Sequence, residues 1–89
     1  MQPRVYILHF PKSDRYYVGS TNNLARRLER HLAGHTHSTK RLGSEFRVVF
    51  TQDMETLEDA RKAEYRIKSW KRRDFIEKII NDGKLKYLQ

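Results

Sequence analysis

Five side chains have the types and spacing that phosphodiester hydrolysis uses. Two are the phenols of Tyr6 and Tyr17, in two β-rich segments near the start of the chain. Arg27 and His31 stand four residues apart, so on a helix their side chains project together. The fifth is the carboxylate of Glu64. If the fold brings them together, they offer an anion-binding cation, a metal-binding carboxylate and groups that can hold or remove a proton.

The two tyrosines belong to a predicted β-hairpin. Residues 4–10 are almost continuously apolar, which is typical of a short strand covered on both faces. Residues 11–14 have turn composition, and residues 15–20 are rich in β-forming side chains. Whether Tyr6 and Tyr17 share a face depends on the strand register, which the sequence leaves open.

A helix predicted at residues 23–33 carries the arginine and the histidine. Its buried stripe is expected to consist of three leucines spaced four residues apart, Leu24, Leu28 and Leu32. Arg27 and His31 should border this stripe, while Arg26 and Arg30 should face water. Two of these four side chains are therefore predicted to lie next to the core.

Glu64 falls inside the apolar face of a second predicted helix, at residues 56–70. The other members of that face are Leu57, Ala60, Ala63, Ile67 and Trp70. A carboxylate among apolar side chains is unfavourable unless it is paired, hydrogen-bonded or bound to a metal. The structural interpretation is a salt bridge to Arg27 or a hydrogen bond from a tyrosine. The functional interpretation is a metal site or an active site.

The remaining elements complete an α+β prediction. A third strand is expected at residues 46–52, and a last amphipathic segment at 75–80 ends before Gly83. Neither proline nor glycine separates this segment from the helix before it, so the two could be one long helix. We predict a three-stranded antiparallel sheet flanked by helices, forming one domain over residues 1–89.

The net charge of +8 is the strongest signal in the composition. A basic surface concentrates polyanions, so nucleic acid is the first candidate partner and an anionic membrane the second. The chain has no cysteine, which excludes disulfides and thiolate zinc sites. It has no apolar run of the roughly 20 residues that span a bilayer. We expect a soluble cytoplasmic protein that does not associate with membranes.

Several basic residues are candidates for nucleic-acid contacts. Arg30 is on the outer face of the first helix, and His37 and Lys40 are in a polar loop that is long for so small a domain. Lys71 and Arg72 belong to the densest cationic run of the chain. The alternative is that these side chains are simply solvated.

The ordered set of motifs resembles the GIY-YIG nuclease superfamily, most closely its small stand-alone bacterial members. Residues 5–6 and 17–19 look like the two tripeptides that name the superfamily. Residues 24–31 match the stretch that follows them, with Arg27 and His31 in place, and Glu64 matches the single acidic position on the later helix. The chain departs from the pattern where Arg4 replaces the first glycine and Val18 replaces isoleucine.

The resemblance implies a divalent-metal-dependent DNA endonuclease. Glu64 would hold one Mg²⁺ or Mn²⁺ ion, and Arg27 would neutralise charge that develops on the scissile phosphate. Tyr6, Tyr17 and His31 would position and deprotonate the attacking water. The base among these three is left open, although the family favours a tyrosine with His31 assisting.

The substrate is expected to be DNA selected by shape or by single-stranded or branched character, because the chain has no room for a second, sequence-reading domain. The protein would act as a monomer or a weak homodimer. The alternative function is a non-catalytic module that binds RNA or DNA. Glu64 discriminates between the two, because a pure binder has no use for an anion at a polyanion site.

Overall fold

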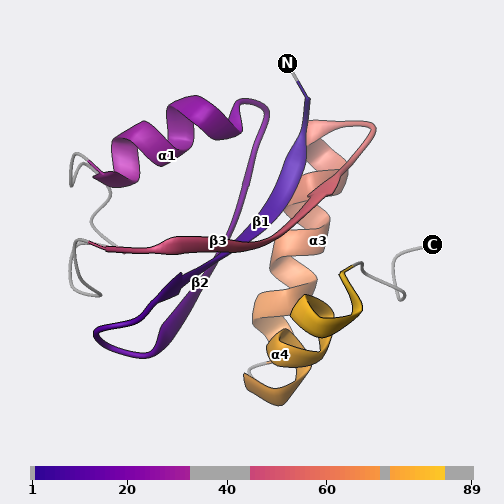
Figure 1. The fold of residues 1–89 in the computed structure, drawn as a ribbon. Helices are drawn as coiled ribbons and strands as arrows, with labels where there is room; N and C mark the ends of the chain where they lie inside the picture. Colours follow the sequence, from indigo (N-terminus) through magenta and orange to yellow (C-terminus); the bar gives the residue numbers. More distant parts are fainter. Residues whose placement is uncertain (1, 33–44, 71–72, 84–89) are drawn as a thin grey trace.

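The central strand of the sheet is the first strand in the chain (Figure 1). This computed structural model describes residues 2–32, 45–70 and 73–83. Its strands are β1 (Arg4–Phe10), β2 (Arg15–Thr21) and β3 (Arg47–Asp53). They form one antiparallel sheet in the order β2-β1-β3. Strand β1 is buried on both faces, as its continuous apolar run predicts, and β2 forms an edge.

The helices pack on both faces of this sheet, which confirms the predicted α+β class. They are α1 (Leu24–Leu32), α3 (Leu57–Trp70) and α4 (Arg73–Asp82). Helix α1 covers one face, and α3 and α4 cover the other (Figure 1). Of the two alternatives that the sequence leaves open for this region, the structure has two helices, since α3 ends at Trp70 and α4 begins at Arg73.

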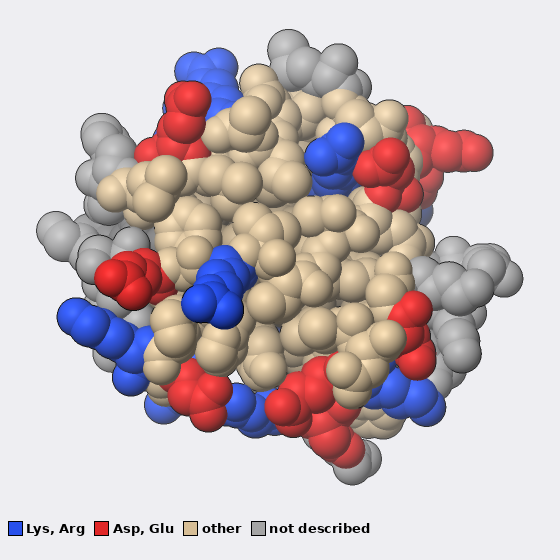
Figure 2. All heavy atoms as spheres, in the orientation of Figure 1, with Lys and Arg blue, Asp and Glu red and all other residues tan. Residues whose placement is uncertain are grey.

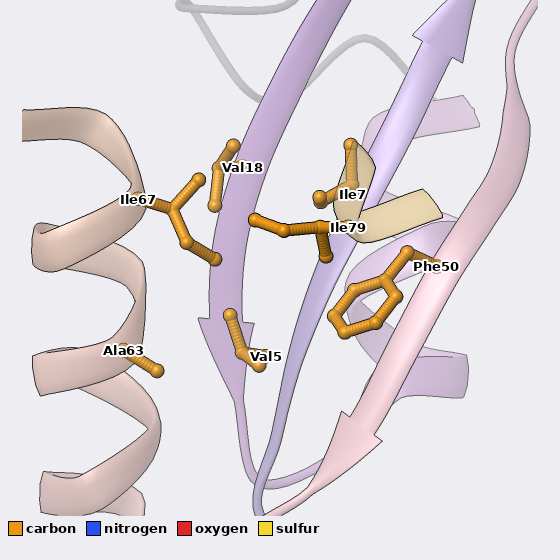
Figure 3. Packing of buried hydrophobic residues seen from close by; sticks show 7 residues of the cluster. All are labelled: Val5, Ile7, Val18, Phe50, Ala63, Ile67 and Ile79. Carbon is orange, nitrogen blue, oxygen red and sulfur yellow. The ribbon is translucent and has the colours of Figure 1, made fainter. Parts of the chain in front are cut away.

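Alternation along the strands divides the core into two clusters. One cluster fills the space between the sheet and helices α3 and α4, and Figure 3 shows its seven buried side chains: Val5, Ile7, Val18, Phe50, Ala63, Ile67 and Ile79. Under α1 lie Tyr6, Leu8 and Phe10, with Phe46 packed against them. Because successive side chains of a strand point to opposite faces, Val5 and Tyr6 contribute to different clusters. The sheet therefore presents Tyr6 and Tyr17 to α1, and Val5, Ile7 and Val18 to α3 and α4.

The apolar stripe of α1 ends differently from the prediction. Leu24 and Leu28 pack against the core, but Leu32 is 68% exposed and His31 is buried in its place. At about 100° per residue, the seventh residue after Leu24 returns close to the stripe, whereas the eighth passes beyond it. The helical period therefore selects the imidazole as the last inward-facing side chain of α1.

An ionic contact joins α4 to the turn between β1 and β2. Arg73 donates hydrogen bonds of 2.7 Å to both the carbonyl oxygen and the carboxylate of Asp14, and His9 contacts the same carboxylate at 2.9 Å. The guanidinium also lies 5.0 Å from the centre of the Tyr16 ring. These contacts fix the start of α4 against the hairpin. Within the described residues, no helix has the length and apolar composition needed to cross a membrane.

Candidate active site

The strand register places the two tyrosines on the same face of the sheet. Leu8 is paired with Tyr17, and Tyr6 is paired with Gly19, so Tyr6 and Tyr17 are diagonal neighbours across β1 and β2. Their ring centres lie 6.3 Å apart. The register therefore decides that Tyr6 and Tyr17 share a face, which the sequence leaves open.

Gly19 makes room for the Tyr6 ring. A Cβ atom added at position 19 would lie 2.5 Å from Cζ of Tyr6 and closer still to its hydroxyl oxygen. No side chain fits at that distance, so glycine is the residue that lets the phenol lie across β2. Gly19, the last residue of the 17–19 tripeptide, therefore leaves the space that the Tyr6 ring occupies on the sheet face covered by α1.

His31 of α1 contacts both tyrosines from the helix that covers their face of the sheet. Its Nε2 atom shares a hydrogen bond of 3.1 Å with the Tyr6 hydroxyl, and its ring centre is 5.2 Å from that of Tyr17. Phe46 of the segment before β3 lies 5.9 Å from the imidazole, so aromatic rings surround His31. Three of the five predicted side chains therefore form one cluster, which we call the aromatic cluster (Tyr6, Tyr17 and His31).

Burial has opposite effects on the pKa values of two members of this cluster. It raises the pKa of Tyr6, and the nearby Tyr17 and Glu64 raise it further, while Arg27 opposes the shift. Burial lowers the pKa of His31, and the positive charge of Arg27 lowers it further. Both changes favour the neutral form, so the phenol keeps its proton and the imidazole stays uncharged at neutral pH.

The lowered pKa of His31 predicts a loss of stability in mild acid. Because the unfolded chain binds a proton near pH 6.5 and the folded chain resists it, the free energy of unfolding should fall as the pH drops below that value. Thermal unfolding between pH 7.5 and 5 measures this slope. His31→Gln, which has no titratable ring, should show a shallower slope, and equal slopes for both proteins would contradict the prediction.

Arg27 and Glu64, the other two predicted residues, line a common pocket at the β2 edge of the sheet. This Arg27–Glu64 pocket has a volume of about 530 Å³ and is bounded by Ser20, Thr21, Asn22, Arg27, Leu57, Arg61 and Glu64. The pocket lies at β2, where α1 contributes Arg27 and α3 contributes Glu64. A guanidinium and a carboxylate from separate helices therefore meet at one concave surface.

The partners of Glu64 differ from both structural alternatives. Ser20 donates a hydrogen bond of 2.5 Å to Oε1, and Lys68 donates one of 2.6 Å to Oε2. Among the described residues, neither Arg27 nor a tyrosine is hydrogen-bonded to this carboxylate. Ser20 follows the β2 alternation onto the α3 face, and Lys68 is one helical turn after Glu64. The side chain is 23% exposed, so it lies at the margin of the apolar face rather than within it.

Lys68 is a residue of this site that the sequence analysis did not identify. Its Nζ atom contacts Glu64 and lies 5.6 Å from the centre of the Tyr17 ring. The ammonium group therefore connects the Arg27–Glu64 pocket with the aromatic cluster across the edge strand. The spacing of Glu64 and Lys68, four residues apart on a helix, is the signal that could have found it.

The candidate nucleic-acid contacts are only partly described. His37, Lys40, Lys71 and Arg72 lie outside the described residues. Arg30 is exposed on α1, as predicted, and lines a second pocket. Figure 2 shows one face of the molecule, on which basic and acidic side chains alternate around a largely uncharged centre. On that face the basic side chains are therefore interspersed with acidic ones.

Glu64 suits a hard divalent cation that keeps most of its waters, rather than a metal ion enclosed by several protein ligands. Among the described residues there is no group of three histidine, aspartate or glutamate side chains that could hold a metal ion. Mg²⁺ keeps several waters and commonly takes one or two carboxylates together with substrate phosphate oxygens. One carboxylate at the wall of an open pocket is compatible with that mode of binding.

Comparison with known proteins assigns the chain to a nuclease family. The sequence model of the GIY-YIG catalytic domain matches residues 2–79. The chain belongs to the GIY-YIG family, which confirms the family predicted from its motifs.

A solved structure supports the same relationship. The chain is similar to a UPF0213 protein from Bacillus halodurans, whose structure was determined by NMR in solution. The two sequences are 31% identical, and the match covers 93% of this chain and 87% of the other at a TM-score of 0.58. No curated protein matches the chain significantly.

Proposed function

We propose that this protein is a divalent-metal-dependent endonuclease that hydrolyses phosphodiester bonds in DNA. The observation that carries the proposal is the pocket shared by Arg27 and Glu64, adjacent to the aromatic cluster, in a chain of the GIY-YIG family. It combines a cation for the phosphate with a carboxylate for a metal ion. A module that only binds nucleic acid gains nothing from that carboxylate, because it repels phosphate.

Arg27 is proposed to bind the scissile phosphate. Arg27 is half-buried and lines the pocket, and no ion pair within the described part of the chain involves it. A planar guanidinium donates two parallel hydrogen bonds to phosphate oxygens and keeps its charge at any physiological pH. Arg27 would thus stabilise the negative charge that increases on these oxygens as the new bond forms.

Glu64 is proposed to hold one Mg²⁺ or Mn²⁺ ion. Such an ion, when bound, acts as a Lewis acid on the phosphate and its leaving oxygen. In the free protein, Oε2 of Glu64 already accepts a hydrogen bond from the ammonium group of Lys68, so this oxygen faces a positive charge where the metal ion would bind. Ser20 holds the other oxygen and fixes the orientation of the carboxylate.

The aromatic cluster is proposed to position the attacking water and accept its proton. Tyr6 has no exposed surface and its raised pKa keeps the phenol protonated, so it is better suited to orient His31 than to act as the base. Tyr17 is the most exposed of the three and is the phenol that solvent reaches. His31 is neutral at physiological pH and retains the capacity to take up a proton.

The proposed substrates are structured or single-stranded DNA. The pocket is lined by guanidinium groups, a carboxylate and small polar side chains, which suit contacts with the sugar-phosphate backbone. Backbone contacts fix the position of a strand without reading its sequence. Selectivity would then depend on the shape or the pairing state of the DNA.

A nicking assay tests this function directly. Purified protein should convert supercoiled plasmid to the open circle, or cut single-stranded or branched oligonucleotides, in Mg²⁺ or Mn²⁺ but not in EDTA. If the protein binds these substrates tightly and cuts none of them with either ion, the non-catalytic binding module is the correct function.

A further inference from the structure

A second pocket adjoins the Arg27–Glu64 pocket. This arginine pocket has a volume of about 320 Å³ and is lined by Thr21, Asn22, Asn23, Arg26, Arg27 and Arg30. It shares Thr21, Asn22 and Arg27 with the Arg27–Glu64 pocket. The two depressions therefore continue into each other, with Arg27 at the boundary between them.

Among the described residues, no ion pair involves the three arginines of the arginine pocket. In the part of the chain that the structure describes, the ion pairs involve other cations, such as Arg73 with Asp14 and Lys68 with Glu64. None of them joins a carboxylate to Arg26, Arg27 or Arg30. Three guanidinium groups without carboxylate partners around one concave surface create a strongly positive potential, which favours an anion.

The geometry of α1 directs two of these groups to one place. Arg26 and Arg30 are four residues apart and both exposed, so their Cβ atoms lie about 5–6 Å from each other on the same side of the helix. Guanidinium groups so placed can converge on a single phosphate. Arg27 is half-buried and also lines the Arg27–Glu64 pocket, so it is available to a different phosphate.

We propose that the arginine pocket binds the phosphodiester next to the scissile one, on one side of the cut. The proposal rests on the proposed function, which places the scissile phosphate between Arg27 and Glu64. Arg26 and Arg30 then hold the neighbouring phosphate and fix the direction in which the strand crosses the site. The substrate is consequently a strand with at least two consecutive phosphodiesters, and a single isolated phosphodiester is a poor substrate.

Salt-dependent binding tests the pocket without relying on cleavage. The affinity for a fluorescent single-stranded oligonucleotide is measured in EDTA over a series of salt concentrations, for the wild type and for Arg26→Ala with Arg30→Ala. Loss of one phosphate contact should reduce the slope of log affinity against log salt by about 0.7. Both arginines are exposed and alanine favours helix, so α1 should remain folded.

A matched double variant controls for the loss of charge. Lys12→Ala with Lys78→Ala also removes two positive charges, one from the hairpin turn and one from α4, and both lysines are exposed. This variant should keep the wild-type slope. If the two double variants change the slope equally, Arg26 and Arg30 act only through net charge and the proposal is overturned.

Neutral phosphate analogues then locate the contact. A methylphosphonate replaces the phosphate on either side of the wild-type cleavage position, and the replacement on one side only should slow cutting about tenfold, the effect of losing one charge-assisted contact. In the variant lacking Arg26 and Arg30, the same replacement should have little further effect. Equal effects on both sides, or on neither, contradict the proposal.

The two tests separate this inference from the proposed function. If the protein cuts no substrate, the endonuclease proposal fails, and the binding slopes still decide whether the arginine pocket holds a phosphate. If the protein cuts and the slopes of the two double variants coincide, the function stands and the second phosphate position is rejected.

Discussion

Glu64→Gln should reduce strand cleavage by at least about a hundredfold while the protein stays folded. The amide has the size of the carboxylate but carries no charge, so it binds a hard divalent cation poorly. It can still accept the hydrogen bond from Ser20, which preserves the packing of α3 against β2. Initial rates of oligonucleotide cleavage in Mg²⁺ and in Mn²⁺ measure the loss, and circular dichroism confirms the fold.

Glu58→Gln is the matched control on the same helix. Glu58 pairs with Lys62 four residues later at 3.7 Å, an arrangement equivalent to that of Glu64 and Lys68, but both partners are exposed and lie outside the Arg27–Glu64 pocket. This variant should cleave at the wild-type rate. If Glu64→Gln also cleaves at that rate, Glu64 has only a structural role and the endonuclease proposal loses its metal ligand.

The stability of Glu64→Gln distinguishes the two interpretations of this carboxylate further. The salt bridge to Lys68 is partly exposed, so its loss should change the free energy of unfolding by about 1 kcal/mol or less. A much larger loss in metal-free buffer would mean that the carboxylate mainly supports the structure. The large effect is therefore expected on cleavage and the small one on thermal stability.

Much of the site could be predicted because its residues carry strong local signals. The tyrosines sit in strands marked by composition, and Glu64 breaks an apolar stripe, which is visible without any structure. The order of the motifs along the chain also predicts the protein family. These signals concern residue type and position within one element, and each survives whatever the neighbouring elements do.

Other features of the site depend on contacts between elements and could not be predicted from the sequence of one element. The register of β1 and β2 decides that Tyr6 and Tyr17 share a face, and the packing angle of α3 decides that Glu64 meets Ser20. The four-residue spacing of the leucines predicts Leu32 in the core, but over two turns this spacing departs from the 3.6-residue period, and Leu32 is exposed. Lys68 belongs to the site through its contacts with Glu64 and the Tyr17 ring, and the second of these depends on how α3 packs beside β2.

Gly19→Ala should destabilise the protein by about 3 kcal/mol, because its Cβ atom would overlap the Tyr6 ring. The ring cannot move aside, since Tyr6 has no exposed surface and its hydroxyl is bonded to His31. For a chain of this size the melting temperature should fall by roughly 12–24 °C. Any protein that still folds should cut poorly, because the aromatic cluster must shift.

Gly83→Ala separates this steric effect from the general effect of replacing a glycine. Gly83 has a positive φ of 72° and no atom within 4 Å of the added Cβ, so only backbone strain of about 1 kcal/mol is expected. Its cleavage rate should be unchanged.

A double-mutant cycle identifies the atoms that collide. In a Tyr6→Ala background the ring is absent, so Gly19→Ala should add far less destabilisation than it does in the wild type. The free energies of unfolding of the four proteins, from urea titrations, give the coupling between the two positions. Additive effects would show that Gly19 is required for its backbone and not for the space it leaves to Tyr6. A large coupling would show instead that the two tripeptide motifs are linked sterically, because the glycine of the second creates the position that the tyrosine of the first occupies.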